Sequence, residues 1–201
     1  MRARTKRIGV VLTALAALAL VGSTPAAARY HGNLNLFVGE KFLDKHDWEP
    51  VDQQGELGLM LAFGIEHAPV HFAMDVLYSQ ADDVVASGFL GPVDVSAKSR
   101  EYALGVRKVW ERGTFQPFVG AGGCLIAVDL DFDANGFHPS YSDNAYGLWV
   151  EGGLQWRLAG HLNLGLDVRF SHADARFSRN GVPVDVAAGG LHAGLLIGYG
   201  W

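Results

Sequence analysis

Apolar residues alternate with polar or small residues in eight separate segments of the chain. In residues 162–171, for example, Leu164 and Leu166 share one face while Asn163 and Asp167 share the other. Successive side chains of a β-strand point to opposite sides of the sheet, so each segment is predicted to be a strand with one apolar face. The segments are residues 33–42, 56–64, 70–79, 101–110, 116–130, 148–158, 162–171 and 190–201. In the glycine-rich segment 116–130, the pattern does not indicate which side chains point to which face of the sheet.

The connections between these segments alternate in length. Long polar stretches, expected to be loops, lie at 44–55, 80–98, 131–145 and 174–186, whereas the short connections lie at 65–69, 111–115 and 159–161. Strands of about ten residues fit a tilted crossing of a bilayer. Short turns on one side and long loops on the other are typical of outer-membrane barrels, with the short turns in the periplasm.

Aromatic residues gather at the two ends of the apolar faces. Such rings are typical of the two interfaces of a bilayer, and a soluble β-sandwich has no reason to sort its aromatics in this way. The opposite face carries charges that would be costly in a dry sandwich core. The sequence therefore predicts an all-β, eight-stranded, antiparallel up-and-down transmembrane barrel. The predicted membrane-interface aromatic belt comprises Phe42, Tyr78, Tyr102 and Phe170 at the long-loop end, and Phe63, Trp110, Trp156, Tyr199 and Trp201 at the short-turn end.

The N-terminus has the order of a secretory signal peptide: basic residues, an apolar run of about 14 residues, then Ala26-Ala27-Ala28. We expect a signal peptide at 1–28 and one barrel domain at 29–201. Removal of the signal peptide takes away four of the 16 basic residues and none of the 21 acidic ones, which argues against nucleic-acid binding. Cys124 is the only cysteine, so no internal disulfide is expected.

With these features the chain resembles the OmpA/OmpX-like superfamily of small outer-membrane barrels. The resemblance rests on the signal peptide, the eight segments, the run Pro117-Phe118-Val119-Gly120-Ala121-Gly122, and the aromatic C-terminus at Tyr199 and Trp201. It implies a bacterial outer-membrane location. It also implies that the barrel assembly machinery reads the alternate residues of the last strand, here Leu195, Ile197, Tyr199 and Trp201.

Charged residues on the polar face are predicted to meet inside the barrel. A three-residue turn at 159–161 would pair Leu158 with Leu162 and set Glu151 opposite Arg169. Because eight strands enclose only enough space for side chains, these residues are expected to fill the lumen as an ion-pair network. The alternative is a gated path for a small solute, in which the charges set selectivity. The predicted network is Glu101, Arg107, Glu151, Arg157, Asp167 and Arg169.

Two further motifs lie in and beyond the third long connection. Asp131, Asp133 and Asn135 reproduce the opening of a calcium loop, but Ser142 stands at the twelfth position in place of a glutamate, so solvated turn residues are the preferred interpretation. His138-Pro139-Ser140 with the later Glu151 is similar to the serine, histidine and acid of outer-membrane lipid A deacylases. We expect no cofactor and no metal.

The expected function is structural or surface interaction without enzymatic activity. Acidic residues in the first two long connections, including Asp44, Asp47, Asp82 and Asp83, suit solvated loops and could also approach divalent ions that bridge lipopolysaccharide. We expect a monomer whose four extracellular loops meet outer-membrane lipid, lipopolysaccharide or another partner. The alternatives are a lipid-modifying enzyme of the deacylase type and a narrow small-solute transporter.

Overall fold

The computed structural model describes residues 30–65, 68–87, 91–133, 138–179 and 182–201. The expected signal peptide, residues 1–28, lies outside the described residues, and so does Asn135 of the candidate calcium loop. Among the described residues, no helix is both long enough and apolar enough to cross a membrane.

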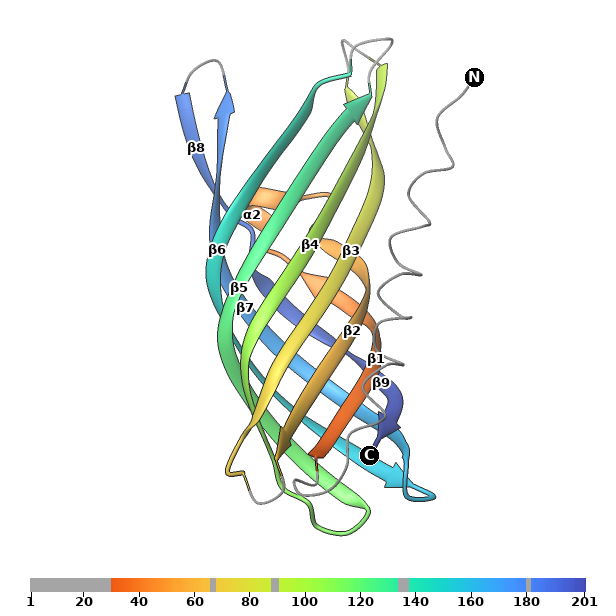
Figure 1. Ribbon diagram of the computed structural model, residues 1–201. Helices are drawn as coiled ribbons and strands as arrows, with labels where there is room; N and C mark the ends of the chain where they lie inside the picture. Colours follow the sequence, from red (N-terminus) through yellow and green to blue (C-terminus); the bar gives the residue numbers. More distant parts are fainter. Residues whose placement is uncertain (1–29, 66–67, 88–90, 134–137, 180–181) are drawn as a thin grey trace, which may run out of the picture.

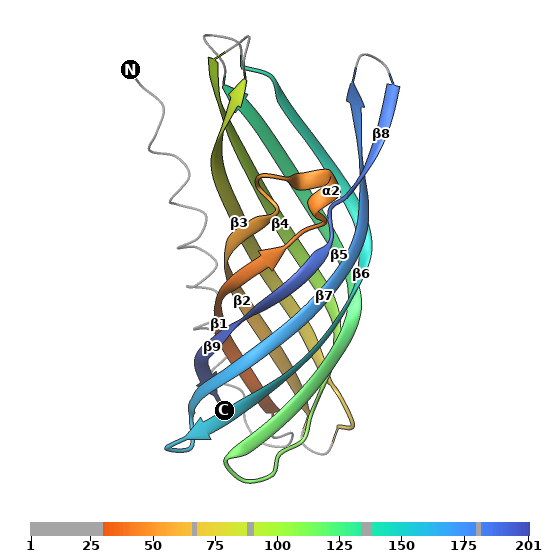
Figure 2. The ribbon, with the colours of Figure 1, turned by 180° about the vertical axis from the view of Figure 1, so that it is seen from behind.

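The chain forms a closed antiparallel barrel in which each strand pairs with its neighbours in the sequence. Strand β9 pairs with both β7 and β1, and this closes the barrel (Figures 1 and 2). The strands are β1 (Tyr30–Phe42), β2 (Gln53–Ile65), β3 (His71–Ser87), β4 (Gly91–Val109), β5 (Phe115–Asp133), β6 (Ser140–Leu158), β7 (Leu162–Arg179), β8 (Val182–Ala187) and β9 (Gly190–Gly200).

Strands β8 and β9 are two parts of one strand, and a short break in the regular pairing at Ala188 and Gly189 separates them. The backbone amides of Ala188 and Gly189 both donate to the carbonyl of Ala173, at 2.8 and 3.2 Å. On either side of this break, β8 and β9 pair with the same edge of β7 in one continuous register. The nine segments therefore make eight strands, and the predicted fold is confirmed.

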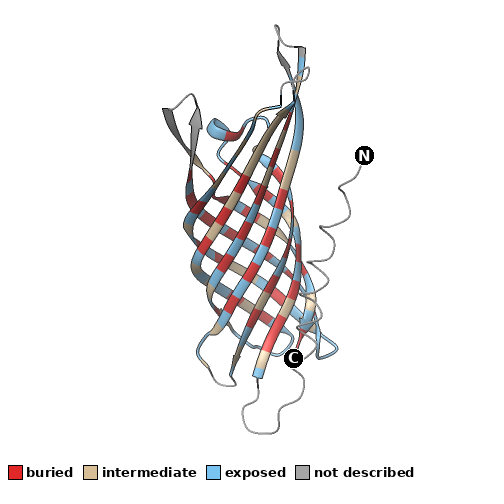
Figure 3. Cartoon of the chain, turned by 45° about the horizontal axis from the view of Figure 1, so that its top comes forward, coloured by how far each residue is buried: buried red, intermediate tan, exposed pale blue. Residues whose placement is uncertain are grey.

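Burial alternates along the strands through the body of the barrel, as the chequered colouring of Figure 3 shows. In β7, Asn163, Asp167 and Arg169 point inward and are buried, while the leucines between them are exposed. The predicted register is observed, with Leu158 opposite Leu162 and Glu151 opposite Arg169. The structure also shows which side chains of the fifth segment point into the barrel, which the sequence pattern did not indicate. Gln116, Phe118, Cys124, Ile126 and Val128 of β5 point inward.

Three of the stretches expected to be loops, 80–98, 131–145 and 174–186, are largely strand. Strands β3 to β7 continue far above the ends of β1 and β2, so one side of the barrel wall is taller than the other (Figure 1). The loop prediction was wrong because these residues alternate with the opposite polarity. Ala97 and Val95 point inward and are buried, while Asp82 and Asp94 are exposed. A sheet standing in water needs this reversal, because its outer face meets solvent instead of lipid.

The first connection contains the short helix α2 (Lys45–Trp48), which lies across the extracellular mouth of the barrel (Figure 2). Asp44 caps it, accepting a hydrogen bond from the amide of His46 at 2.8 Å. Trp48 is 3% exposed and its Nε1 donates to the carbonyl of Ala187 at 2.6 Å. The amide of Ala187 in turn donates to Asp47 at 2.9 Å. These two bonds tie the helix to the base of the β7–β8 hairpin.

Candidate functional site

The periplasmic end of the lumen holds a cluster of amide side chains. Gln155 donates to Gln116 at 2.7 Å, and Asn163 donates to Asn33 at 3.0 Å. Arg157, which was predicted to join the ion-pair network, instead donates to Asn33 and to Asn163. The structure places Arg157 among these amides because its cross-strand partner on β7 is Asn163.

The middle of the lumen holds two arginines between two carboxylates. The guanidinium of Arg107 pairs with Asp75 at 3.0 Å and also with Glu151. The guanidinium of Arg169 pairs with Glu151 at 2.7 Å and also with Asp75, and it stacks over the Trp149 ring at 4.5 Å. Four strands, β3, β4, β6 and β7, thus meet through one buried cluster. Charges buried in this way stabilise a fold only when they are paired, as these are.

A second set of charges joins this cluster from above. Lys41 lies 4.0 Å from Glu101, which lies 3.6 Å from Arg169. His192 lies between two carboxylates, 2.8 Å from Glu56 and 3.6 Å from Glu101. Sequence reasoning placed these residues on the polar face but could not tell which would meet, because the contacts cross the lumen between strands that are not neighbours. Asp167 is also buried, and its Oδ1 atom has no hydrogen-bond partner among the described residues.

These side chains fill the lumen at this level. Lys41, Arg169 and His192 are at most 1% exposed. The described side chains at this level are therefore shielded from bulk solvent. Above them the inner wall turns apolar, and Trp48 from α2 packs with the small and aliphatic residues Ala97, Ile126, Val128, Ala145 and Ala175.

The outward face of the tall wall carries a second cluster, above the apolar belt. Arg100 lies beside Tyr78 on the neighbouring strand and pairs with Asp129. Lys98, one row higher, lies 3.7 Å from Asp131. These pairs are partly exposed to solvent, so each contributes little to stability.

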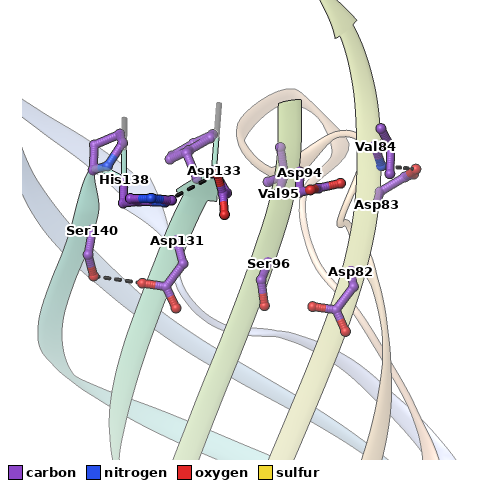
Figure 4. A pocket seen from close by; sticks show the side chains of 12 residues that line it. Asp82, Asp83, Val84, Asp94, Val95, Ser96, Asp131, Asp133, His138 and Ser140 are labelled. Atoms are coloured by element: carbon purple, nitrogen blue, oxygen red, sulfur yellow. Dashed lines mark hydrogen bonds and ion pairs between the residues drawn. The ribbon is translucent and has the colours of Figure 1, made fainter. Parts of the chain in front are cut away.

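The next row crosses four strands as Asp82, Ser96, Asp131 and Ser140, which Figure 4 shows side by side. Ser140 donates to Asp131 at 2.7 Å. The Ser96 hydroxyl beside it and the Gln80 amide, which donates to it at 2.8 Å, hold the pKa of Asp82 below its ordinary value. This row borders a cavity of about 530 Å³ near the tips of β3 to β6 (Figure 4).

The described residues of the two weaker motifs do not come together as the sites for which they were considered. Asp133 pairs with His138 at 3.2 Å, and no group of three or more metal-ligating residues occurs within the described part of the chain. Glu151 lies in the lumen, bound to both arginines, whereas Ser140 and His138 border the extracellular cavity. The structure therefore does not bring Glu151 together with Ser140 and His138.

The residues predicted for the aromatic belt all lie on the outward face and are exposed, between 38% for Phe42 and 53% for Tyr199. Most of the strand surface between them is aliphatic, with Leu59, Met74, Leu104 and Val168 among the exposed residues. A continuous outward apolar surface of this kind is far larger than a soluble monomer exposes. It matches the hydrocarbon layer of a bilayer.

No protein-family model and no curated protein sequence matches the chain. Solved structures do match it. It aligns with the outer membrane protein OprG from Pseudomonas aeruginosa at 17% identity and a TM-score of 0.56, over 86% of this chain and 94% of that one. It also aligns with Ail, the attachment invasion locus protein of Yersinia pestis, in a complex with the heparin analogue sucrose octasulfate. That alignment has 11% identity and a TM-score of 0.55, and it covers 86% of this chain and 99% of that one.

A major outer membrane protein from Thermus thermophilus gives 11% identity and a TM-score of 0.55, over 86% of this chain and 98% of that one. At these identities the similarity shows the fold. Together with the outward apolar surface, it identifies the chain as an integral β-barrel with the architecture of the small barrels of the bacterial outer membrane.

Proposed function

We propose that this chain, which has the outer-membrane barrel fold of the OmpA/OmpX-like class, is a non-enzymatic anchor that presents its extracellular sheet to lipopolysaccharide. The observation that carries the proposal is the reversal of polarity on the outward face. Below Tyr102 this face is apolar, and directly above it come Arg100 and Lys98, followed by rows of carboxylates and hydroxyls.

The position of the two cations supports a lipid partner. They lie at the height where the apolar belt ends, which is where the headgroups of the outer leaflet begin. Lipopolysaccharide headgroups carry phosphates, and a guanidinium binds phosphate through two parallel hydrogen bonds. Asp129 and Asp131 hold the cations on one face, and they can themselves approach divalent ions that bridge the phosphates.

The interior supports an anchor over the two alternatives. A transporter needs a passage, whereas buried ion pairs fill the described lumen. A serine hydrolase needs an acid to orient its histidine, whereas Glu151 is bound to Arg107 and Arg169.

The lipid proposal can be tested on the purified barrel in nanodiscs. Lipopolysaccharide with Mg²⁺, added to phosphatidylcholine discs, is expected to raise the melting temperature of the barrel by roughly 5 °C, because a ligand that binds only the folded state stabilises it. The variant Lys98→Ala/Arg100→Ala should lose most of that increase. The matched control Lys108→Ala/Arg112→Ala removes two cations near the periplasmic end and should keep it. An equal increase in both variants would contradict the proposal.

The enzymatic alternative makes a separate prediction. If the chain modified lipid A, deletion of its gene would change the lipid A mass spectrum of the cell, and Ser140→Ala would reproduce the change. We expect an identical spectrum in all three strains. A mass shift that Ser140→Ala shares with the deletion would replace the anchor with an enzyme.

A further inference from the structure

The buried charges of the lumen do not balance. Among the residues that the structure describes, the buried carboxylates are Glu56, Asp75, Glu101, Glu151 and Asp167, and the buried permanent cations are Lys41, Arg107 and Arg169. Five carboxylates therefore face three permanent cations. His192 can supply a further positive charge, because its ring lies 2.8 Å from Glu56 and 3.6 Å from Glu101. One carboxylate is still left without a counter-charge.

Asp167 is the carboxylate that the cations do not reach. The lumen arginines pair with the other carboxylates of the cluster, Asp75, Glu101 and Glu151. Within the described residues, Asp167 takes part in no ion pair and its Oδ1 atom has no hydrogen-bond partner, although the residue is only 2% exposed. A carboxylate buried in this way is strongly disfavoured in its ionised form.

The surroundings of Asp167 are apolar. Its neighbours in the register are two glycines, Gly153 of β6 on one side and Gly194 of β9 on the other. The ring of Phe118 covers Gly153 and the ring of Phe37 covers Gly194, so a Cβ atom at either glycine would collide with a ring. Both rings belong to a buried apolar cluster with Met60, Leu77 and Leu196. Aromatic rings thus fill the space on both sides of Asp167, and they cannot solvate a negative charge.

A proton can neutralise Asp167 where a metal ion cannot. A hard metal ion needs about six oxygen ligands. The surrounding rings offer none, and no group of three or more metal-ligating residues occurs in the described ranges. We propose that the folded barrel binds one proton at Asp167, which is therefore a neutral carboxylic acid in the lumen at neutral pH. Together with a positive charge on His192, this proton makes the buried cluster electrically neutral.

The groups around Asp167 favour the neutral form. The charged or titratable groups that face it are Glu56 on β2, Asp75 on β3, Arg107 on β4, Glu151 on β6, His192 on β9 and Arg169 on its own strand. The carboxylates among them repel a further negative charge. Each of the two arginines is already bound by at least two other carboxylates. A proton on Asp167 removes the repulsion and leaves those ion pairs undisturbed.

A proton at Asp167 makes the stability of the barrel depend on pH. An exposed aspartate is ionised at neutral pH, so the unfolded chain has released the proton that the folded chain holds. When the folded state holds one proton more than the unfolded state, the equilibrium constant of unfolding rises about tenfold with each pH unit. Acid therefore stabilises the barrel through Asp167.

Asp167→Asn tests this on the full barrel, because an amide has the size of a carboxylic acid and cannot ionise. Unfolding by urea is measured in lipid vesicles at pH values of about 5 to 7. With each pH unit, the unfolding constant of the original barrel is expected to rise at least threefold more than that of Asp167→Asn. Asp174→Asn makes the same change at an exposed position of β7 and should keep the original pH dependence.

Infrared spectroscopy of the folded barrel detects the proton without any unfolding. A protonated carboxyl has a carbonyl band that ionised carboxylates lack, and isotope labelling of aspartate assigns the band to aspartate side chains. We expect the original barrel at neutral pH to show such a band with the intensity of one residue. The band should be absent from Asp167→Asn and present in Asp174→Asn.

Two kinds of result would overturn the proposal. Equal pH dependence in the original barrel and Asp167→Asn, or the absence of an aspartate carbonyl band at neutral pH, would show that Asp167 is ionised in the folded barrel. A gain in stability when sodium replaces choline at constant ionic strength, present in the original barrel and lost in Asp167→Asn, would make a metal ion the occupant in place of the proton.

Discussion

Arg169 lies at the centre of the lumen cluster, in contact with Asp75, Glu101 and Glu151. Removing one partner from a buried ion pair leaves the others unpaired in a medium of low dielectric constant. We expect Arg169→Met to lower the free energy of unfolding by about 3–5 kcal/mol, measured by urea denaturation in lipid vesicles.

The matched control for this prediction is Arg100→Met, which breaks an ion pair on the outward face. Both partners of that pair are partly exposed, so the loss should stay below about 1 kcal/mol. If the two variants lost the same small amount, the cluster would not hold the four strands together.

Trp201 closes the last strand against the first. Its amide donates to the carbonyl of Gly32 at 3.0 Å, its carbonyl accepts from the amide of Gly32 at 3.1 Å, and its ring covers Gly32. We expect Trp201→Asp to reduce sharply the fraction of heat-modifiable protein in outer-membrane extracts, because it removes an interfacial ring and the last residue of the expected assembly signal. Trp201→Phe should keep that fraction near the original. Normal insertion of Trp201→Asp would count against the assignment.

At the scale of the element, helix α2 is held in the mouth chiefly by Trp48. Replacing this ring by alanine removes both its packing in the apolar layer and its hydrogen bond to Ala187. The connection should then open locally while the barrel persists. Trypsin is expected to cleave after Lys45 at least tenfold faster in Trp48→Ala, and the strands should remain protected. In Trp48→Phe, which keeps a ring, the increase should be smaller. Unchanged cleavage in Trp48→Ala would show that other contacts hold the helix.

The elements could be predicted wherever both faces of a strand carried side chains of distinct polarity. The turn at 159–161 fixed the register of β6 and β7, so Glu151 could be placed opposite Arg169. The facing of β5 could not be read because Gly120, Gly122 and Gly123 contribute no side chains. One of these glycines has a packing role. A Cβ at Gly120 would lie only 2.5 Å from a carboxylate oxygen of Glu151.

The strand extensions and the site were harder to predict. Asp82, Asp94 and Asp131 make their segments polar enough to resemble loops, although the residues between them point into an apolar layer. The meeting of Lys41, Glu101 and His192 depends on the barrel being closed, which the local pattern of a single strand does not contain.

At the scale of the whole molecule, three levels succeed one another along the lumen. Amides lie near the periplasm, ion pairs beside a small apolar cluster of Phe37, Met60, Leu77, Phe118 and Leu196 lie in the middle, and apolar residues lie beneath α2. An apolar belt surrounds these layers, and a polar sheet rises above them on one side (Figure 3). This arrangement is the basis of the proposal that the barrel holds an extracellular surface in place and does not conduct.

Single-channel recording in planar bilayers tests that account most directly. Arg107, Arg169 and their carboxylates occupy the lumen. The purified barrel is therefore expected to give no steady conductance steps at neutral pH, whatever voltage is applied. Reproducible ohmic steps from the unmodified barrel would contradict it, because they require a continuous water-filled passage through the lumen.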